Sequence, residues 1–288
     1  MARQKWKGPS HKIGSGSAER GNPLISRMEA ASPARIAGIY RYPVKGLTPE
    51  QLGRAELKPG QTLLADRRYA IENGPSGFDP AEPKWLPKPH FLMLMRDEWL
   101  AGLHTRFDDS SHVLTIRHDG KIAAEGDLET AQGRAAIENF FASTFPDLIR
   151  GPPKILESAG HSFSDVARKV VSIINLASVR AIENMVGAPV HPLRFRANLY
   201  VEGWPAWHEF DLLDRTLSIG DVRLKVVKRI VRCAAVNVDP DTAARDLSIP
   251  QALQRRLGHA DCGIYAEVIT GGSIGDGDTI APEQPELL

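Results

Sequence analysis

The sequence has few cysteines, no long apolar segment and almost no net charge. Its two cysteines, Cys233 and Cys262, are too few for a disulfide framework in 288 residues, and we interpret both as reduced thiols of a cytoplasmic protein. Neither belongs to a CxxC pair or to a Cys/His spacing typical of zinc. No apolar run is long enough to cross a bilayer, so no membrane span is expected. The formal charge of +1 gives no indication of nucleic acid as a partner.

The first residues differ in composition from the rest. Residues 1–35 hold seven Lys or Arg against two Glu, and residues 14–17 alternate glycine and serine. No hydrophobic segment follows these charges, so a secretory signal is excluded, and no strand precedes the glycines as a dinucleotide fingerprint requires. We interpret residues 1–34 as a disordered basic tail. The alternatives are an upstream extension of a start at Met28 and an organelle presequence.

Hydrophobic patterning predicts many short strands and few helices. Strands are expected at residues 36–42, 51–57, 68–71, 91–95, 199–201, 217–219, 222–227, 231–238 and 264–269, and a hairpin is expected over 113–122 with its turn at Asp119-Gly120. Helical spacing is present at 136–145, 176–186 and 249–257; Asn175 is the expected N-cap of the second helix, and Gly187 follows its end. This pattern indicates an α+β chain, predominantly β, with barrel- or sandwich-like regions.

The best candidate for a boundary between two halves is the Gly-Pro-Pro segment at 151–153. We therefore expect a first region over residues 35–150 and a second over 151–288.

Cys233 is the residue with the clearest chemical potential. It follows Arg232 at the expected end of a strand, and the chain then reaches the turn sequence Asp239-Pro240-Asp241. A neighbouring guanidinium favours the thiolate, the form that binds soft metals or attacks electrophiles. Taken alone, the Arg-Cys pair is more typical of a small apolar residue in a core strand.

Basic residues elsewhere provide candidate anion contacts. Arg194, Arg196 and Asn198 alternate, so a strand would place them on one face, suited to a phosphate or polar heterocycle. Lys45 precedes Gly46 in a turn, and residues 175–178 begin a helix whose free N–H groups suit an anion. Each of these motifs also has a plain structural explanation, as a solvated face, a turn or a helix cap.

In combination, the motifs resemble the MOSC family, named for the C-terminal part of molybdenum cofactor sulfurases. The similarity is to the branch with an N-terminal MOSC barrel region, which includes the mitochondrial amidoxime reducing component and its bacterial relatives. The matching segments cover roughly residues 35–281 and are 42–46, 66–69, 175–178, 194–201, 232–241, 263–265 and the Gly-Asp turn at 277–278. The resemblance implies two β-barrel-like regions, an N-terminal MOSC barrel over residues 35–150 and a MOSC domain over 151–288.

The resemblance also implies a site. Cys233 would be the protein ligand to the molybdenum of a molybdopterin cofactor, and pyridoxal phosphate is not expected. Asp239 would lie near the metal, either as a proton donor or as a turn residue. The pterin and its phosphate would be held by residues matching Lys45, Arg67, Asn175, Ser178, Arg196, Asn198 and Arg232.

The function implied is an oxidoreductase that reduces small N-hydroxylated compounds. The chain has too few cysteines for an iron–sulfur cluster of its own and no flavin-binding Rossmann pattern. Electrons would therefore come from a separate partner, such as a ferredoxin-, flavodoxin- or cytochrome b5-like protein. The alternative is a sulfur-carrier or cofactor-carrier protein in which Cys233 holds a persulfide; a third is a degenerate barrel that only binds.

Overall fold

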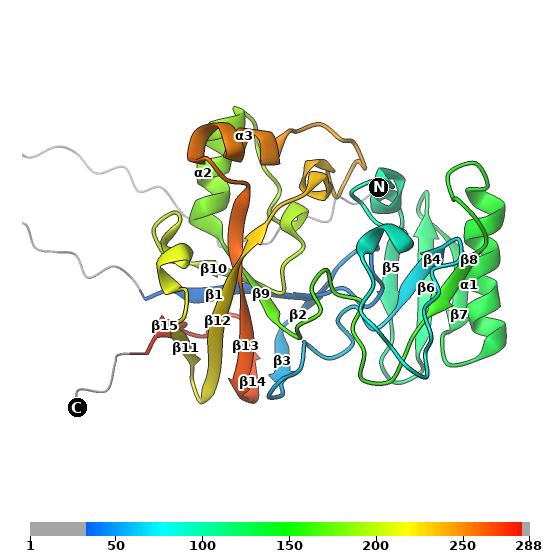
Figure 1. Cartoon of the computed structure of the whole chain (residues 1–288), viewed down its shortest axis with the longest axis horizontal. Coiled ribbons are helices and arrows are strands. Elements are labelled where there is room, and N and C mark those ends of the chain that lie inside the picture. The colour runs from blue at the N-terminus through cyan, green and yellow to red at the C-terminus, as the bar shows by residue number, and fades with distance from the viewer. Residues whose placement is uncertain (1–32, 284–288) are drawn as a thin grey trace, which may run out of the picture.

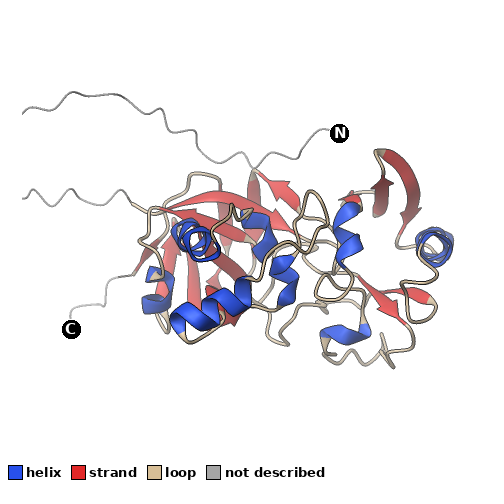
Figure 2. Cartoon of the chain, turned by 90° about the horizontal axis from the view of Figure 1, so that it is seen from above, coloured by secondary structure: helices blue, strands red, loops and turns tan. Residues whose placement is uncertain are grey.

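The computed structural model describes residues 33–283, and the predicted tail at 1–34 lies almost entirely outside this range. The largest element is an eight-stranded sheet that curls around an apolar core (Figures 1 and 2). Only the neighbours β9 and β10 are parallel. Across the sheet, the strands are β15 (Ala281–Pro282), β11 (Thr216–Ile219), β12 (Val222–Val231), β13 (Asp261–Thr270), β9 (Val171–Asn175), β10 (Leu199–Glu202), β1 (Arg35–Arg41) and β2 (Glu50–Leu52).

Two helices cover one end of this sheet, α2 (Leu176–Val186) and α3 (Ile249–Leu257) (Figure 1). The side chain of Asn175 accepts a hydrogen bond from the Ala177 N–H at 3.0 Å, and Gly187 ends α2 with a φ of 71°. Both predicted helix boundaries are thereby confirmed. Between these helices and the sheet lies a second apolar core that includes Ile182 and Leu253.

The other half of the molecule has its own core, formed by smaller sheets and helix α1 (Ala131–Thr144). Helix α1 packs closely on β7, because a Cβ on Gly133 would lie only 2.1 Å from the Asp127 carbonyl oxygen. The predicted hairpin is present as β6–β7. The strands of this half are β5 (His104–Phe107), β6 (Val113–His118) and β7 (Lys121–Asp127) in one sheet, and β4 (Ala70–Asn73) with β8 (Pro153–Leu156) in another.

The two halves of the sequence share their sheets. Strands β1 and β2, from the first half, extend the large sheet beside β10. Strand β8 begins at the last proline of the Gly-Pro-Pro segment but pairs with β4, and β3 (Arg54–Leu57) pairs with β14 (Gly272–Gly275). The predicted α+β, mostly β architecture is confirmed. Strands on the two sides of the proposed boundary at residue 151 pair with each other, so the two regions are not separate in space.

Three strand predictions near the site are wrong. Residues 91–95 form a single bridge at Phe91 and then a turn, in which the Asp97 carboxylate accepts from the Met93 N–H at 2.9 Å. The strand predicted at 231–238 ends at Val231, as part of β12. Arg194 and Arg196 do not share a strand face, because residues up to Phe195 form a 3₁₀ turn and Arg196 is left-handed, with a φ of 51°.

The 3₁₀ helices are η1 (Lys88–His90), η2 (Glu98–Gly102), η3 (Pro192–Phe195), η4 (His208–Leu212) and η5 (Ala234–Asn237).

Within residues 33–283, no helix is both long enough and apolar enough to cross a membrane. The same range contains no group of three His, Cys, Asp or Glu side chains arranged to hold a metal ion. A metal site built only from such protein ligands is therefore absent from the described residues.

Candidate functional site

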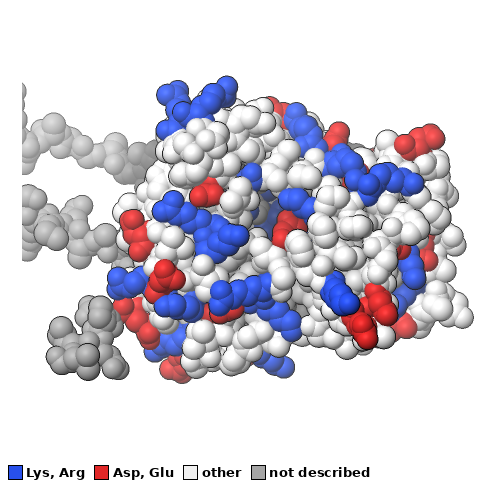
Figure 3. Space-filling view, viewed as in Figure 1, with Lys and Arg blue, Asp and Glu red and all other residues white. Residues whose placement is uncertain are grey.

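A cavity of about 240 Å³ lies between the two halves of the molecule. It is visible as a hollow bordered by basic side chains in Figure 3. Its acidic lining residues are Asp66 and Asp165. Eight basic residues line it, namely Lys45, Arg67, Lys88, Arg194, Arg196, Lys228, Arg229 and Arg232. The excess of cations over carboxylates makes the cavity suited to an anion.

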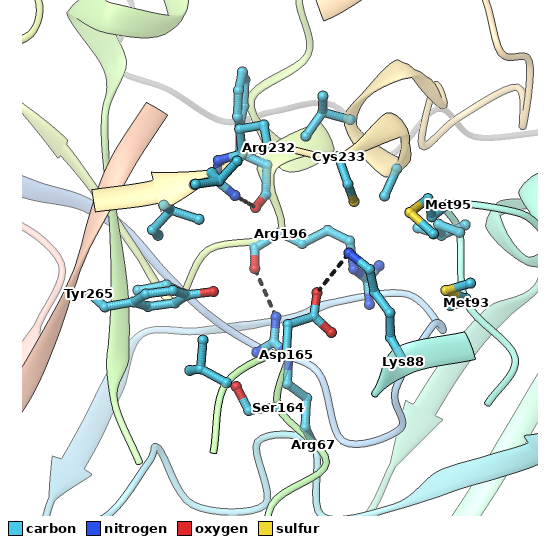
Figure 4. A pocket seen from close by; sticks show the side chains of 18 of the residues that line it. Arg67, Lys88, Met93, Met95, Ser164, Asp165, Arg196, Arg232, Cys233 and Tyr265 are labelled. Carbon is cyan, nitrogen blue, oxygen red and sulfur yellow. Dashed lines mark hydrogen bonds and ion pairs between the residues drawn. The ribbon is translucent and has the colours of Figure 1, made fainter. Parts of the chain in front are cut away.

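Cys233 enters this cavity from the turn that follows β12. Its backbone is extended at the N-cap of η5, and its carbonyl accepts from the Val236 N–H at 3.2 Å. The side chain is partly exposed and points into the cavity (Figure 4). Cys262, by contrast, is fully buried, and burial raises its pKa to about 12. Of the two thiols, only Cys233 lines the cavity.

Arg232 is held beside Cys233 by backbone carbonyls. Its Nε donates to the Cys262 oxygen at 2.7 Å, and its Nη1 donates to the Phe195 oxygen at 2.9 Å. The remaining nitrogen, Nη2, is buried and has no hydrogen-bond partner among the described residues. A Cβ on Gly263 would lie 3.1 Å from this nitrogen, so glycine leaves room around it. A buried, unpartnered guanidinium nitrogen is costly unless a ligand completes its hydrogen bonding.

Arg67 and Arg196 form a second cationic group, stacked on Tyr42. Their guanidinium carbons lie 4.6 and 4.4 Å from the centroid of the Tyr42 ring. Arg67 Nη2 donates to the Arg196 carbonyl at 2.9 Å, and Arg196 Nη2 donates to the Leu47 carbonyl at 2.8 Å. Burial lowers the pKa of Arg196, which shows that its charge is poorly solvated. This pair therefore supplies planar hydrogen-bond donors, and a bound anion would stabilise their poorly solvated positive charges.

The ammonium of Lys45 already has two protein hydrogen-bond acceptors. It donates to the Phe163 carbonyl at 2.8 Å and to Asp165 Oδ1 at 2.5 Å. Burial lowers the pKa of Lys45, opposed by Asp165. Burial also acts to raise the pKa of Asp165, but Lys45 and the other cations bring it well below its usual range. Asp165 is thus an ionised carboxylate held in the wall of the cavity.

The structure brings together six of the predicted site residues and leaves three outside. Lys45, Arg67, Arg196, Asn198, Arg232 and Cys233 all line the cavity. The amide of Asn198, however, is used in holding strands. Its Oδ1 accepts from the Ser172 hydroxyl at 2.8 Å, and its Nδ2 donates to the Tyr40 carbonyl at 3.1 Å.

The residues outside the cavity are Asn175, Ser178 and Asp239. The first two bind the buried carboxylate of Glu209, each at 2.9 Å. Asp239 accepts hydrogen bonds from the Asp241 and Thr242 N–H groups in a turn and pairs with Arg194 at 2.8 Å. Of the two roles considered for Asp239, its position corresponds to the turn residue.

Several cavity residues were missed by sequence reasoning. Lys88 and Asp165 lie in irregular segments without any motif, and Met93 and Met95 were expected in a buried strand. Tyr265, whose hydroxyl points into the cavity, belongs to the segment 263–265 that carries part of the family resemblance, but no role was predicted for it (Figure 4).

Two family models match the chain. The MOSC domain matches residues 158–281, and the MOSC N-terminal beta barrel domain matches residues 33–150. The chain therefore belongs to the MOSC family and carries the N-terminal barrel domain that accompanies it in part of that family.

Similar proteins were found by sequence and by structure. The chain is 37% identical over 244 residues to a molybdenum cofactor sulfurase from Caenorhabditis elegans, covering 81% of this chain and 33% of that protein. It is 25% identical over 233 residues to the Caenorhabditis briggsae protein of the same name, covering 76% and 31%. The chain thus spans about one third of these relatives. The crystal structure of the YuaD protein from Bacillus subtilis aligns with a TM-score of 0.40 at 15% identity, covering 86% of this chain and 93% of that one.

Proposed function

We propose that the cavity binds a molybdenum cofactor and that Cys233 is the protein ligand to the metal. The observation that carries this proposal is the position of Cys233, whose thiol faces a cavity lined by eight basic and two acidic residues. A thiolate is a suitable ligand for a soft transition metal. The surrounding cations suit the phosphate of a pterin cofactor.

The residues present fit such a group. Arg232 has a buried Nη2 without a partner, and among the described residues only the Leu47 carbonyl accepts a hydrogen bond from Arg196. Both arginines can therefore bind an anion without first breaking ion pairs. Arg67 already pairs with Asp66 at 2.5 Å but adds its charge to the same wall. We assign Arg196 and Arg232 as the main anion contacts, with Arg67 and Lys45 as supporting charges.

Asn175, Ser178, Asn198 and Asp239 enter the proposal indirectly. Asn198 would keep the wall in place through its bonds to Ser172 and Tyr40. Asn175 and Ser178 would do so through Glu209, and Asp239 through the turn after Cys233. Their proposed role is to position the contact residues.

The reaction we propose is the reduction of small N-hydroxylated compounds. When bound, the cofactor supplies a redox-active metal that can exchange electrons. The chain itself contributes the thiolate of Cys233, the arginines that orient the anionic end of the cofactor, and the side chains of Met93 and Met95, which add apolar surface to the cavity. With two cysteines in the whole sequence, the chain cannot hold a cysteine-ligated iron–sulfur cluster, and a separate protein would deliver the electrons.

The second candidate function is sulfur transfer, with Cys233 carrying a persulfide. It is favoured by the similarity to proteins named molybdenum cofactor sulfurase, although the chain spans only about one third of them. A carrier of sulfur needs the thiol of Cys233. It has less use for Arg196 and Arg232 arranged around an anion site, which is why we place it second.

One experiment separates the two functions. Protein expressed in a host that makes the cofactor is assayed for benzamidoxime reduction with a chemical electron donor. The Cys233 peptide is examined by mass spectrometry for an added sulfur atom, with Cys262→Ala as the control variant. Turnover that is lost in Cys233→Ala, without added sulfur on Cys233, supports the reductase. Added sulfur on Cys233 together with absence of turnover would replace it with the carrier.

A further inference from the structure

Lys88 is a cation of the cavity wall that the sequence analysis did not predict as a site residue. It lies in η1 between two prolines, and its side chain is 27% exposed. Its ammonium is 3.9 Å from Asp165 Oδ2. Figure 4 shows Lys88 extending towards both the carboxylate of Asp165 and the sulfur of Cys233. A positive charge is therefore present where Cys233 faces the cavity.

The segment that carries Lys88 is fixed to the segment that carries Asp165. Trp85 Nε1 donates to the Ser164 carbonyl at 3.2 Å, and the rings of Phe91 and Phe163 pack edge to face at 5.5 Å. Pro87 and Pro89 restrict the backbone on either side. Lys88 is thus held in position before any ligand arrives, which reduces the entropic cost of binding.

The ammonium of Lys88 hydrogen-bonds to the side chain of Cys233. Asp165 has a closer partner in Lys45, and no oxygen atom of residues 33–283 accepts a hydrogen bond from Lys88. An ammonium has three N–H donors, so Lys88 can donate to a ligand in addition to Cys233.

The wall of the cavity beside Cys233 is apolar. Met93 and Met95 line it, and their loop is tied to the Cys233 turn by Arg245. This arginine donates to the Ala234 carbonyl at 2.8 Å and to the Met95 carbonyl at 3.3 Å. Methionine side chains adapt to apolar groups of varied shape. The space beside Cys233 therefore combines one cation with an adaptable apolar wall.

We propose that Lys88 is a specificity-determining residue that selects small substrates with an apolar body and a negatively charged group, such as a carboxylate. The inference rests on the proposed function, because it assigns Arg196 and Arg232 to the cofactor and leaves Lys88 for the substrate. Lys45 is less suited to this role, since it is buried and Asp165 and the Phe163 carbonyl occupy two of its three donors.

The test compares two substrates that differ in one charge, benzamidoxime and 4-carboxybenzamidoxime, with cofactor-loaded protein. In Lys88→Gln, the KM for the carboxylated compound should rise about fivefold, the upper end of the effect of losing one partly exposed charge pair. The kcat for the carboxylated compound and the KM for benzamidoxime should change less than about twofold. The lost contact with the carboxylate is equally strong in the bound substrate and in the transition state, and benzamidoxime lacks that carboxylate. Lys88→Arg should restore the low KM. Lys84→Gln, an exposed lysine in the same loop, serves as the matched control.

Two further measurements separate this inference from the proposed function. Isothermal titration with 4-carboxybenzamidoxime measures binding directly, whether or not the protein turns over. Tighter binding to wild type than to Lys88→Gln supports the role of Lys88 even if reduction is absent, and equal affinity overturns it. Pterin content is measured in parallel. A large loss of pterin in Lys88→Gln would also overturn the inference, because Lys88 would then be a cofactor contact.

Discussion

Arg194 and Arg196 are two positions apart but have opposite surroundings. Arg194 is 1% exposed in its side chain and pairs with Asp239 and Asp246, both at 2.8 Å. Arg196 lies over the ring of Tyr42 and has one protein acceptor among the described residues. The left-handed backbone at Arg196 turns the two side chains in different directions. Both terminal nitrogens of Arg194 are engaged by protein acceptors, and its buried Nε alone has no partner among the described residues, so Arg196 has more donors available to a ligand.

Arg196→Ala should yield folded protein with little cofactor. Removing one partner of a partly buried charged contact costs about 2–5 kcal/mol in binding, or roughly a thirty- to several-thousand-fold loss of affinity. Arg196→Lys should recover only part, since lysine lacks the planar fork. Pterin fluorescence after oxidation measures the content, and circular dichroism confirms folding. Arg180→Ala, an exposed arginine on α2, is the control. Equal pterin in Arg196→Ala and wild type would remove this residue from the site.

At the level of single residues, the sequence predicted the cavity only where a family motif was present. Cys233, Arg232, Arg196, Arg67 and Lys45 were placed by that resemblance, and all five line the cavity. Lys88 and Asp165 could not be predicted, because they meet through the packing of Phe91 on Phe163, residues 72 positions apart whose contact no local pattern encodes.

Among the elements, η3 and η5 together hold the Cys233 turn. Arg194 extends from η3 and donates to the Asn237 carbonyl at the end of η5, at 3.0 Å. The side chain of Asn237 in turn accepts from the Ile249 N–H at 2.9 Å, at the start of α3. The position of Cys233 therefore depends on a buried polar network that joins three elements.

Arg194→Ala should destabilise the fold and reduce cofactor binding only as a consequence. Breaking a buried ion pair by removing one partner costs roughly 3–5 kcal/mol, and the lower end is expected here because Asp239 and Asp246 are partly exposed. Urea denaturation measures the loss, with Arg255→Ala, an exposed arginine on α3, for comparison. A stable Arg194→Ala protein that lacks cofactor would instead make Arg194 a direct contact.

Elements with local signals were predicted well, and those shaped by distant contacts were not. The turn at Asp119 and Gly120, with φ of 50° and 77°, matches the sequence pattern of the β6–β7 hairpin. The apolar run at 91–95 also has the composition of a strand. It forms a turn instead. The side chains of Asp97 and Arg245 hydrogen-bond to its backbone N–H and C=O groups, so these groups do not pair with a neighbouring strand.

In the whole molecule, the cavity requires both halves of the chain. Lys45, Arg67 and Lys88 come from the first half, whereas Arg196 and Cys233 come from the second. The pairing of β1 with β10 and of β4 with β8 fixes the halves together. This pairing between the two halves was not predictable from the sequence. The Gly-Pro-Pro segment has the local composition of a domain boundary, and no local pattern indicates which distant strands pair with each other.

The first 30 residues should be dispensable. Their composition gives no pattern for a core, and truncation at chain ends is usually tolerated. Deleting residues 1–30 should leave the melting temperature and cofactor content unchanged. Deleting residues 1–41, which also removes β1 from the sheet, should prevent folding and serves as the contrast. A large drop in melting temperature for the shorter deletion would show that the tail packs on the body.

The most direct test of the central claim is X-ray absorption at the molybdenum edge, combined with metal analysis, on wild type, Cys233→Ser and Cys262→Ala. If Cys233 is the ligand, wild type and Cys262→Ala contain up to one molybdenum per chain with the same sulfur coordination. Cys233→Ser then either loses the metal or retains it with one fewer sulfur neighbour, because the alcohol is a poor replacement for a thiolate. Wild-type protein without molybdenum, or Cys233→Ser with unchanged metal and unchanged sulfur coordination, would contradict the account.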